Sequence, residues 1–133
     1  MPITRVLETC LYAADLVAAE AFYRDVLGLA PFARSAGRHV FFRCGDGVLL
    51  VFNPEATSVP GQDVPPHGAR GAGHVCFAIG ADELDSWRGR LASHGVAVEA
   101  VVTWPRGGRS LYVRDPAGNS VELAPPGIWG VGT

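Results

Sequence analysis

Residues 114–123, Arg-Asp-Pro-Ala-Gly-Asn-Ser-Val-Glu-Leu, join a tight turn to an apolar strand that carries one acidic side chain. Proline pre-sets φ for a turn, and glycine and asparagine tolerate positive φ, so the stretch predicts a β-hairpin. Apolar residues 111–113 precede the turn, and Val121 and Leu123 flank Glu122 on the returning strand. A carboxylate buried there must be paired, protonated or bound to a cation, because burying it bare is costly.

The overall composition limits the class of protein. The chain has 133 residues, a length that suits one domain or two small fused half-domains. It is 48% hydrophobic and 18% charged with a net charge of −2, which is typical of a folded protein. The absence of a Lys/Arg cluster and of a long apolar run predicts no nucleic-acid partner and no membrane association. Three cysteines without CxxC spacing and an N-terminus without a signal-peptide pattern favour a reducing cytoplasm.

Alternation and helical spacing predict a chain that repeats itself, each half reading strand–helix–strand–strand–strand. The expected helices follow Asp15 and Asp82, about Leu16 to Leu27 in the first case, and end at Gly28 and Gly95. A Pro- and Gly-rich loop separates the halves, and the tail shows no clear structure. The expected strands are 6–12, 29–33, 38–44, 48–53, 73–79, 96–103, 109–114 and 120–124.

The repeat places particular residues at equivalent positions. Glu8 corresponds to His74, and Cys10 to Cys76, each pair 66 residues apart; in the last strand of each half, Leu50 corresponds to Glu122. In each half the apolar face of the first strand can pack on that half's helix. The opposite faces, with Glu8 and His74, would then face a common concave interior.

Glu8, His74 and Glu122 therefore form a candidate site for a divalent metal. Two carboxylates and one imidazole on rigid strands suit a hard-to-borderline ion, and water would complete its coordination shell. The alternative is that the histidine is an ordinary hydrogen-bonded strand residue and that the acids reach solvent. The equivalence of Glu8 and His74 in two repeats favours the metal site.

Four segments, residues 8–16, 21–29, 73–77 and 112–122, resemble the vicinal oxygen chelate superfamily, which includes glyoxalase I, bleomycin-resistance proteins, fosfomycin-resistance enzymes and extradiol dioxygenases. The resemblance runs from about Ile3 to Pro125 and implies an α+β fold of two βαβββ modules that form a curved, cup-shaped mixed sheet. Residues 1–133 would form one such domain. Its parts would be module one (about 3–54), a loop (55–72), module two (about 73–125) and a tail (126–133).

The resemblance also bears on the ligands. Its first-strand ligand, usually His and sometimes Gln, falls on Glu8, its second-module His on His74, and its terminal Glu on Glu122. A fourth ligand of glyoxalase I falls at or next to Leu50, so that set is incomplete here. An additional carboxylate in place of imidazole favours Mg²⁺, Mn²⁺ or Zn²⁺ over an iron site, although the identity of the ion, nickel and iron included, stays open.

Several residues are candidates for binding the substrate. Tyr112 can donate a hydrogen bond to a metal-bound oxyanion or serve as a core aromatic. Arg43 can hold a carboxylate, and a solvated position is the alternative. Cys10 and Cys76 share the inward faces as thiols or as small buried residues. The remaining candidates are the aromatic side chains Phe41 and Trp104.

The sequence thus predicts a metal-dependent enzyme of small molecules, with Glu122 and Tyr112 as catalytic residues. Lyase or isomerase chemistry on neighbouring substrate oxygens is favoured, and a homodimer is implied by the resemblance. The alternatives are an extradiol-type dioxygenase and a metal-free protein that sequesters a small molecule.

Overall fold

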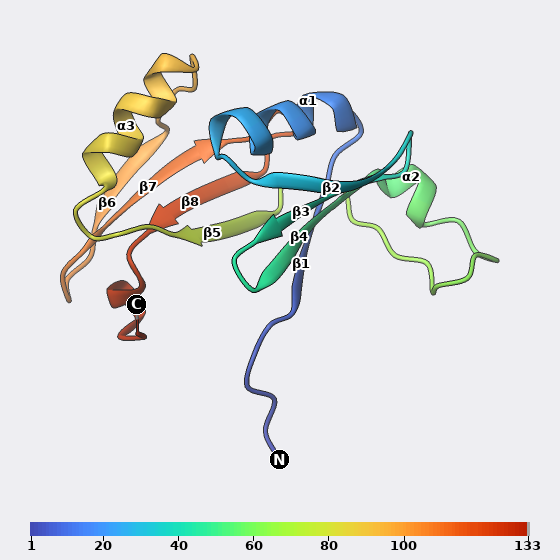
Figure 1. The fold of residues 1–133 in the computed structure, drawn as a ribbon, viewed down its shortest axis with the longest axis horizontal. Helices are drawn as coiled ribbons and strands as arrows, with labels where there is room; N and C mark the ends of the chain where they lie inside the picture. The colour runs from blue at the N-terminus through green and yellow to red at the C-terminus, as the bar shows by residue number, and fades with distance from the viewer. Residues whose placement is uncertain (133) are drawn as a thin grey trace. The chain divides into compact units, whose positions relative to one another are not determined.

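The computed structural model describes residues 1–132; residue 133, the last of the predicted tail, lies outside them. By their internal contacts, the residues divide into two compact units, Met1–Gly71 and Ala72–Thr133. Each unit builds one four-stranded sheet with a helix beside it (Figure 1). This confirms the predicted α+β architecture of two βαβββ modules. None of the described helices is long and apolar enough to cross a membrane.

The sheet of the first unit has the order β1-β4-β3-β2. β1 pairs with β4 in parallel, and the other neighbours are antiparallel, so the sheet is mixed. α1 lies against β3 and β4, and its Ala19 is buried with Phe42 and Val51 of the sheet. The elements are β1 (Glu8–Tyr12), α1 (Leu16–Ala21), η1 (Phe22–Val26), β2 (Ala30–Ser35), β3 (His39–Cys44), β4 (Gly47–Phe52) and α2 (Pro54–Thr57).

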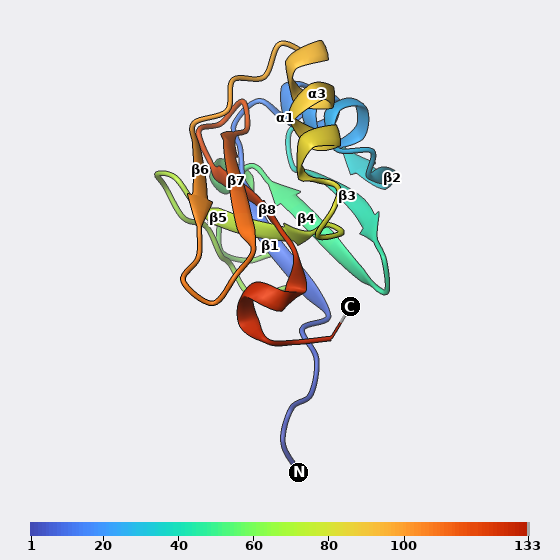
Figure 2. The same ribbon diagram turned by 90° about the vertical axis from the view of Figure 1, so that its left-hand side faces the viewer.

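The second unit repeats this plan in the order β5-β8-β7-β6. β5 is parallel to β8, and β7 is antiparallel to both β6 and β8. Figure 2 shows α3 beside this sheet and the C-terminal turn η2 following β8. The elements are β5 (His74–Ala78), α3 (Leu84–Ser93), β6 (Ala100–Thr103), β7 (Arg109–Arg114), β8 (Ser120–Ala124) and η2 (Pro126–Trp129).

The strand registers confirm the predicted equivalence of the two halves. Cys10 of β1 lies opposite Leu50 of β4, and Cys76 of β5 lies opposite Glu122 of β8. Leu50 and Glu122 therefore occupy the same place in the two sheets. The first unit buries an apolar side chain there, whereas the second buries a carboxylate.

Five local predictions were wrong. The strand expected over 96–103 covers only Ala100–Thr103. The first strand begins at Glu8 rather than Val6, and Leu7, expected in the core, is 64% exposed. Residues 54–57 of the expected linker form a short helix because Asn53 caps it, accepting a hydrogen bond from the Glu55 amide. The second helix is preceded by Glu83, not capped by Asp82. The tail forms the turn η2 because two prolines fix its start.

The first helix also differs from a regular α-helix. Asp15 caps it as predicted, because its carboxylate accepts a hydrogen bond from the Ala18 amide at 3.0 Å. From Phe22 onward the helix widens into a π-helix, in which the Leu27 amide bonds the carbonyl of Phe22. The widened turn places Phe22, Tyr23 and Val26 in the core. Hydrophobic spacing alone does not distinguish such a turn from an α-helix.

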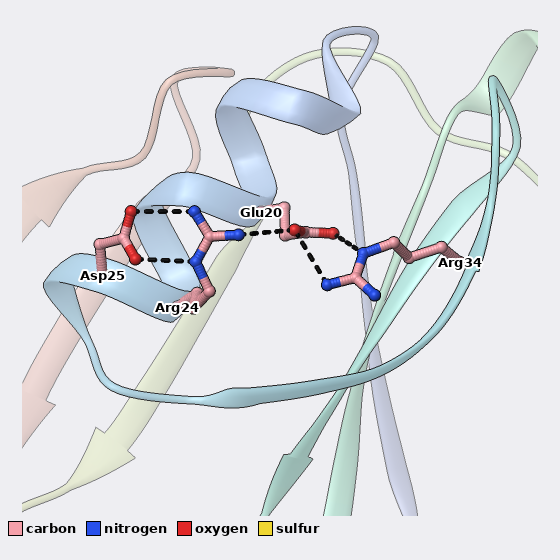
Figure 3. Close-up of polar contacts among 4 residues, drawn as sticks. All are labelled: Glu20, Arg24, Asp25 and Arg34. Atoms are coloured by element: carbon pink, nitrogen blue, oxygen red, sulfur yellow. Dashed lines mark hydrogen bonds and ion pairs between the residues drawn. The ribbon is translucent and has the colours of Figure 1, made fainter.

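A network of four charged side chains joins the first helix to β2 (Figure 3). Glu20 accepts hydrogen bonds from Arg34 on β2 and, at 2.8 Å, from Arg24 one turn later. Arg24 also binds Asp25 through two nitrogens. Because the partners of the partly buried Glu20 are exposed, we expect the network to orient the helix more than to stabilise it.

Candidate metal centre in the second unit

The turn between β7 and β8 fixes the strand that carries the histidine. The Asp115 carboxylate accepts hydrogen bonds from the amides of Ala117 and Asn119 and from the Asn119 side chain, each at 2.9 Å. The side-chain oxygen Oδ1 of Asn119 in turn accepts a bond from the Gly73 amide at 2.8 Å. The turn at residues 115–119 therefore holds the start of β5 beside β8.

His74 follows directly, and one of its ring nitrogens is committed to the backbone. Its Nδ1 lies 3.1 Å from the Ser120 carbonyl oxygen. Since a carbonyl only accepts, Nδ1 must carry the proton in this bond. Nε2 then either holds a lone pair or carries a second proton. It faces Glu122, with 3.4 Å between Nε2 and Oε1.

Glu122 is 6% exposed, and each of its oxygens has a neighbour. Ser110 on β7, which is fully buried, donates to Oε2 at 2.5 Å. The indole Nε1 of Trp104 donates to the same serine oxygen at 2.7 Å. Oε1 is the oxygen that faces the imidazole. The carboxylate is therefore held on one side and directed at His74 on the other.

The donor atoms of this pair fit a divalent metal. A lone pair on Nε2 facing an ionised oxygen is unfavourable unless a proton or a cation lies between them. Two ligand atoms that each lie about 2.1 Å from a tetrahedral ion are about 3.4 Å apart. The separation in the structure has this value. The bond from Nδ1 to a carbonyl is also the usual support of a metal-binding histidine.

Two further side chains adjoin this pair. Cys76 lies opposite Glu122 across β5 and β8; burial of its thiol and the Glu122 carboxylate raise its pKa to about 12. Tyr112 lies opposite Glu122 across β7 and β8, and its ring stacks near His74 with the ring centres 6.4 Å apart. Burial, and then the charge of Glu122, raise the pKa of the Tyr112 phenol. Both groups are therefore protonated at neutral pH.

The remaining predicted site residues belong to the first unit. Glu8 and Cys10 are exposed on the face of β1 that they share with Tyr12. Burial is the main cause that raises the pKa of the Cys10 thiol. Phe41 stacks on His39 with ring centres 4.0 Å apart, and the Arg43 guanidinium lies over an aromatic ring of β2 rather than on a carboxylate.

The structure thus brings together four of the predicted residues, His74, Cys76, Tyr112 and Glu122. Within neither unit, over the residues described, do three His, Cys, Asp or Glu side chains gather as a metal site. Glu8 as the third ligand stays a prediction. Trp104 donates its indole hydrogen to Ser110, and its contact with a ligand stays a prediction.

Ser110 is the functional candidate that sequence reasoning missed. Alternation already placed Ser110 and Tyr112 on one face of their strand. The missing information was the pairing of β7 with β8, which sets Tyr112 directly opposite Glu122 and Ser110 diagonally from it.

A cavity of about 570 Å³ lies at the other end of the second unit. Its walls are mostly apolar and come from the end of β5, the turn between β6 and β7, and the η2 turn. Ala78, which lines it, is on the same face of β5 as His74 and Cys76. His74 and Glu122 are not part of its lining.

Comparison with known proteins identifies the family. A lactoylglutathione lyase from Agrobacterium tumefaciens has 46% identity and a TM-score of 0.95, over 98% of this chain and 100% of that one. A glyoxalase/dioxygenase from Nostoc punctiforme has 26% identity and a TM-score of 0.67, over 90% and 89%. A glyoxalase/bleomycin resistance protein/dioxygenase from Nocardioides has 22% identity and a TM-score of 0.74, over 94% and 85%.

A search of curated protein sequences gives no significant match. The family model for this fold, in contrast, matches residues 5–123, almost the whole length of both units. The chain therefore belongs to the glyoxalase/bleomycin resistance protein/dioxygenase superfamily.

Proposed function

We propose that the protein is a divalent-metal-dependent lyase or isomerase of small molecules that carry neighbouring oxygen atoms. The observation that carries this proposal is the pair of His74 Nε2 and Glu122 Oε1, 3.4 Å apart with their other polar atoms already bonded. The 46% identity to a protein described as a lactoylglutathione lyase supports the lyase class. Glu8, the residue equivalent to His74 in the other unit, is proposed as the third ligand.

Each residue has a distinct part in this proposal. A bound divalent ion would act as a Lewis acid that polarises the substrate's oxygens. His74 and Glu122 would hold the ion, and the bond from Nδ1 to the Ser120 carbonyl fixes the imidazole so that Nε2 is available to bind it. Tyr112 stays protonated because its pKa is raised, so it can donate a hydrogen bond to a substrate oxygen that gains charge.

Leu50 limits the chemistry. It occupies the place in the first unit that Glu122 occupies in the second, and it is buried. A fourth carboxylate ligand, which the resemblance to glyoxalase I implies at this position, is therefore replaced by an apolar side chain. We accordingly propose the lyase or isomerase class without assigning the substrate of the Agrobacterium relative.

Metal analysis tests this proposal. Protein stripped with chelator is titrated with Zn²⁺, Mn²⁺ and Mg²⁺ by calorimetry, and its lactoylglutathione lyase activity is assayed with and without each ion. We expect tight binding of one ion per chain, lost in His74→Ala and Glu122→Gln. His94→Ala, at the end of α3, is the matched control and should bind as the native chain does. Absence of binding to the native protein would overturn the proposal.

A second candidate function is metal-free sequestration of a small aromatic or cationic molecule. The observation that favours it is a group of aromatic rings in the first unit. Phe52 contacts Phe41 and His67 edge-on, and His67 Nδ1 lies 2.7 Å from the Tyr12 hydroxyl. This candidate predicts ligand binding that chelator leaves unchanged and that Phe41→Ala weakens.

The resemblance also implies a homodimer, which we propose as the working assembly. Light scattering of the purified protein tests it: twice the mass of the chain is expected, and the mass of one chain would contradict it.

A further inference from the structure

We propose that Ser110 and Trp104 form a positioning relay. Trp104 donates to Ser110, and Ser110 donates to one oxygen of Glu122, so that only the other oxygen is available to bind an ion. This inference rests on the proposed metal-dependent function. It concerns how the chain holds its own ligand, and it assigns roles to a serine and an indole that do not touch the ion.

The donors and acceptors of the relay match one another, and the Tyr112 hydroxyl adjoins both Ser110 and Glu122 as a further partner. An indole nitrogen only donates, so Trp104 Nε1 gives its hydrogen to Ser110 Oγ. The serine hydroxyl then directs its own hydrogen at Glu122 Oε2, 2.5 Å away. An ionised carboxylate accepts this bond, and a bond of this kind is stronger than one between neutral groups. Oε1 is left for the imidazole side.

Burial makes the relay difficult to replace with water. Ser110 is 0% exposed and Glu122 is 6% exposed. If the serine hydroxyl is removed, Oε2 loses its serine donor in a place that solvent does not reach freely, and only Tyr112 and Cys76 remain beside the carboxylate as donors on the sheet. Without that bond the carboxylate would be free to rotate, and both of its oxygens would be available to a bound ion. The relay therefore controls how many oxygen atoms Glu122 offers.

The position of Trp104 is fixed by the turn that carries it. Its amide bonds the Gly108 carbonyl, and its carbonyl accepts from the Gly107 amide, both at 3.0 Å. Gly107 and Gly108 both have positive φ. A Cβ on Gly108 would lie 2.9 Å from the Ile128 side chain, so the turn packs closely on η2. The relay thus begins at Trp104 in a tightly packed turn and ends at the carboxylate of Glu122.

The test compares Ser110→Ala and Trp104→Phe with two matched controls. Ser86→Ala removes an exposed helix serine, and Trp87→Phe removes an indole that stacks with Arg90 on α3. Zn²⁺ affinity is measured by competition with a chelating dye, and Co²⁺-loaded protein is examined by visible absorption. Removing a partner that supports a metal ligand typically lowers affinity about 10–100-fold.

We expect Ser110→Ala to lose about 10-fold or more in Zn²⁺ affinity and Trp104→Phe to lose less, while both controls bind as the native chain does. The cobalt absorption of Ser110→Ala should weaken, because a second oxygen from Glu122 raises the coordination number. A purely structural serine would not change this band once the protein is loaded. Circular dichroism verifies that each variant is folded, and Trp104→Phe remains informative if Ser110→Ala does not fold.

Two results would overturn the relay. The first is Ser110→Ala and Trp104→Phe binding Zn²⁺ like their controls. The second is a loss of affinity with an unchanged cobalt spectrum, which would mean that Glu122 keeps the same ligand atoms. Either result leaves the proposed function intact, since the native protein still binds the ion. A native protein that binds no ion would overturn the relay and the proposed function together.

Discussion

We expect the buried carboxylate of Glu122 to add nothing to the free energy of unfolding, or to lower it. Replacing Glu122 and its partner Ser110 together tests this expectation. Ser110→Ala alone leaves an ionised oxygen without its donor, which costs about 1.5–3 kcal/mol for a hydrogen bond to a charged group. Glu122→Leu alone takes the carboxylate acceptor away from the serine hydroxyl at a cost of about 1–3 kcal/mol, while the serine oxygen still accepts from Trp104. That cost is offset because the carboxylate no longer has to be desolvated.

The double variant removes the serine–carboxylate pair, and the Trp104 indole loses its acceptor in it just as it does in Ser110→Ala alone. Replacing a buried polar pair with apolar side chains is often neutral or stabilising, and the first unit already buries Leu50 at the equivalent place. We therefore expect Glu122→Leu/Ser110→Ala to be more stable than Ser110→Ala alone by about 2 kcal/mol, because the unbonded indole is common to both variants and the unbonded carboxylate oxygen is not. The coupling energy of the double-mutant cycle should be about 2 kcal/mol in favour of the double variant.

The assay is urea unfolding followed by circular dichroism, with chelator present so that no metal contributes. In a second series with saturating Zn²⁺, the native chain should gain about 2.7 kcal/mol at a free ion concentration of 100 times Kd. The Glu122→Leu chain should gain nothing. Additive effects of the two single substitutions would refute the reasoning, because the two groups would then not be partners.

Three further predictions concern other groups. Tyr12→Phe removes the bond to His67 Nδ1 and should lower the free energy of unfolding by about 0.5–1.5 kcal/mol, measured with urea; an unchanged value would mean that the bond is absent in solution. Burial, and then the charge of Arg38, lower the pKa of His39, so the unfolded chain takes up a proton on this imidazole at a higher pH than the folded chain does. The free energy of unfolding should therefore fall as pH drops below about 6.5. Urea unfolding at pH 8 and pH 5.5 should show a smaller difference in His39→Gln than in the native chain. The pKa of Cys76 is raised to about 12, partly by Glu122, so alkylation at pH 8 followed by mass spectrometry should be slow and should accelerate in Glu122→Gln, and equal rates would contradict this.

The repeat explains how much of the fold could be predicted. Counting residues between Cys10 and Cys76 and between Leu50 and Glu122 anticipated the strand registers, because each module pairs its first strand with its last in the same way. The turn at 115–119 was equally predictable, since its bonds run between residues close in sequence. The start of the first strand was not, because Leu7 alternates correctly but lies largely in solvent.

The site was predicted less completely for a physical reason. Alternation indicates which face of a strand a residue lies on, but not which side chain of the neighbouring strand it meets. Ser110 was therefore placed on the correct face without its partner, and Trp104 was expected to contact a ligand. The tautomer of His74 also depends on a backbone carbonyl that sequence does not locate.

The central claim is that His74 and Glu122 hold a divalent ion, and the imidazole nitrogens report on it most directly. In chelator-treated protein with ¹⁵N-labelled histidine, Zn²⁺ titration should shift the Nε2 resonance of His74, with saturation at one ion per chain. Nδ1 should keep its proton, because it stays bonded to the Ser120 carbonyl. If the His74 resonances stay unchanged with Zn²⁺ in excess, the pair does not bind the ion and the account is contradicted.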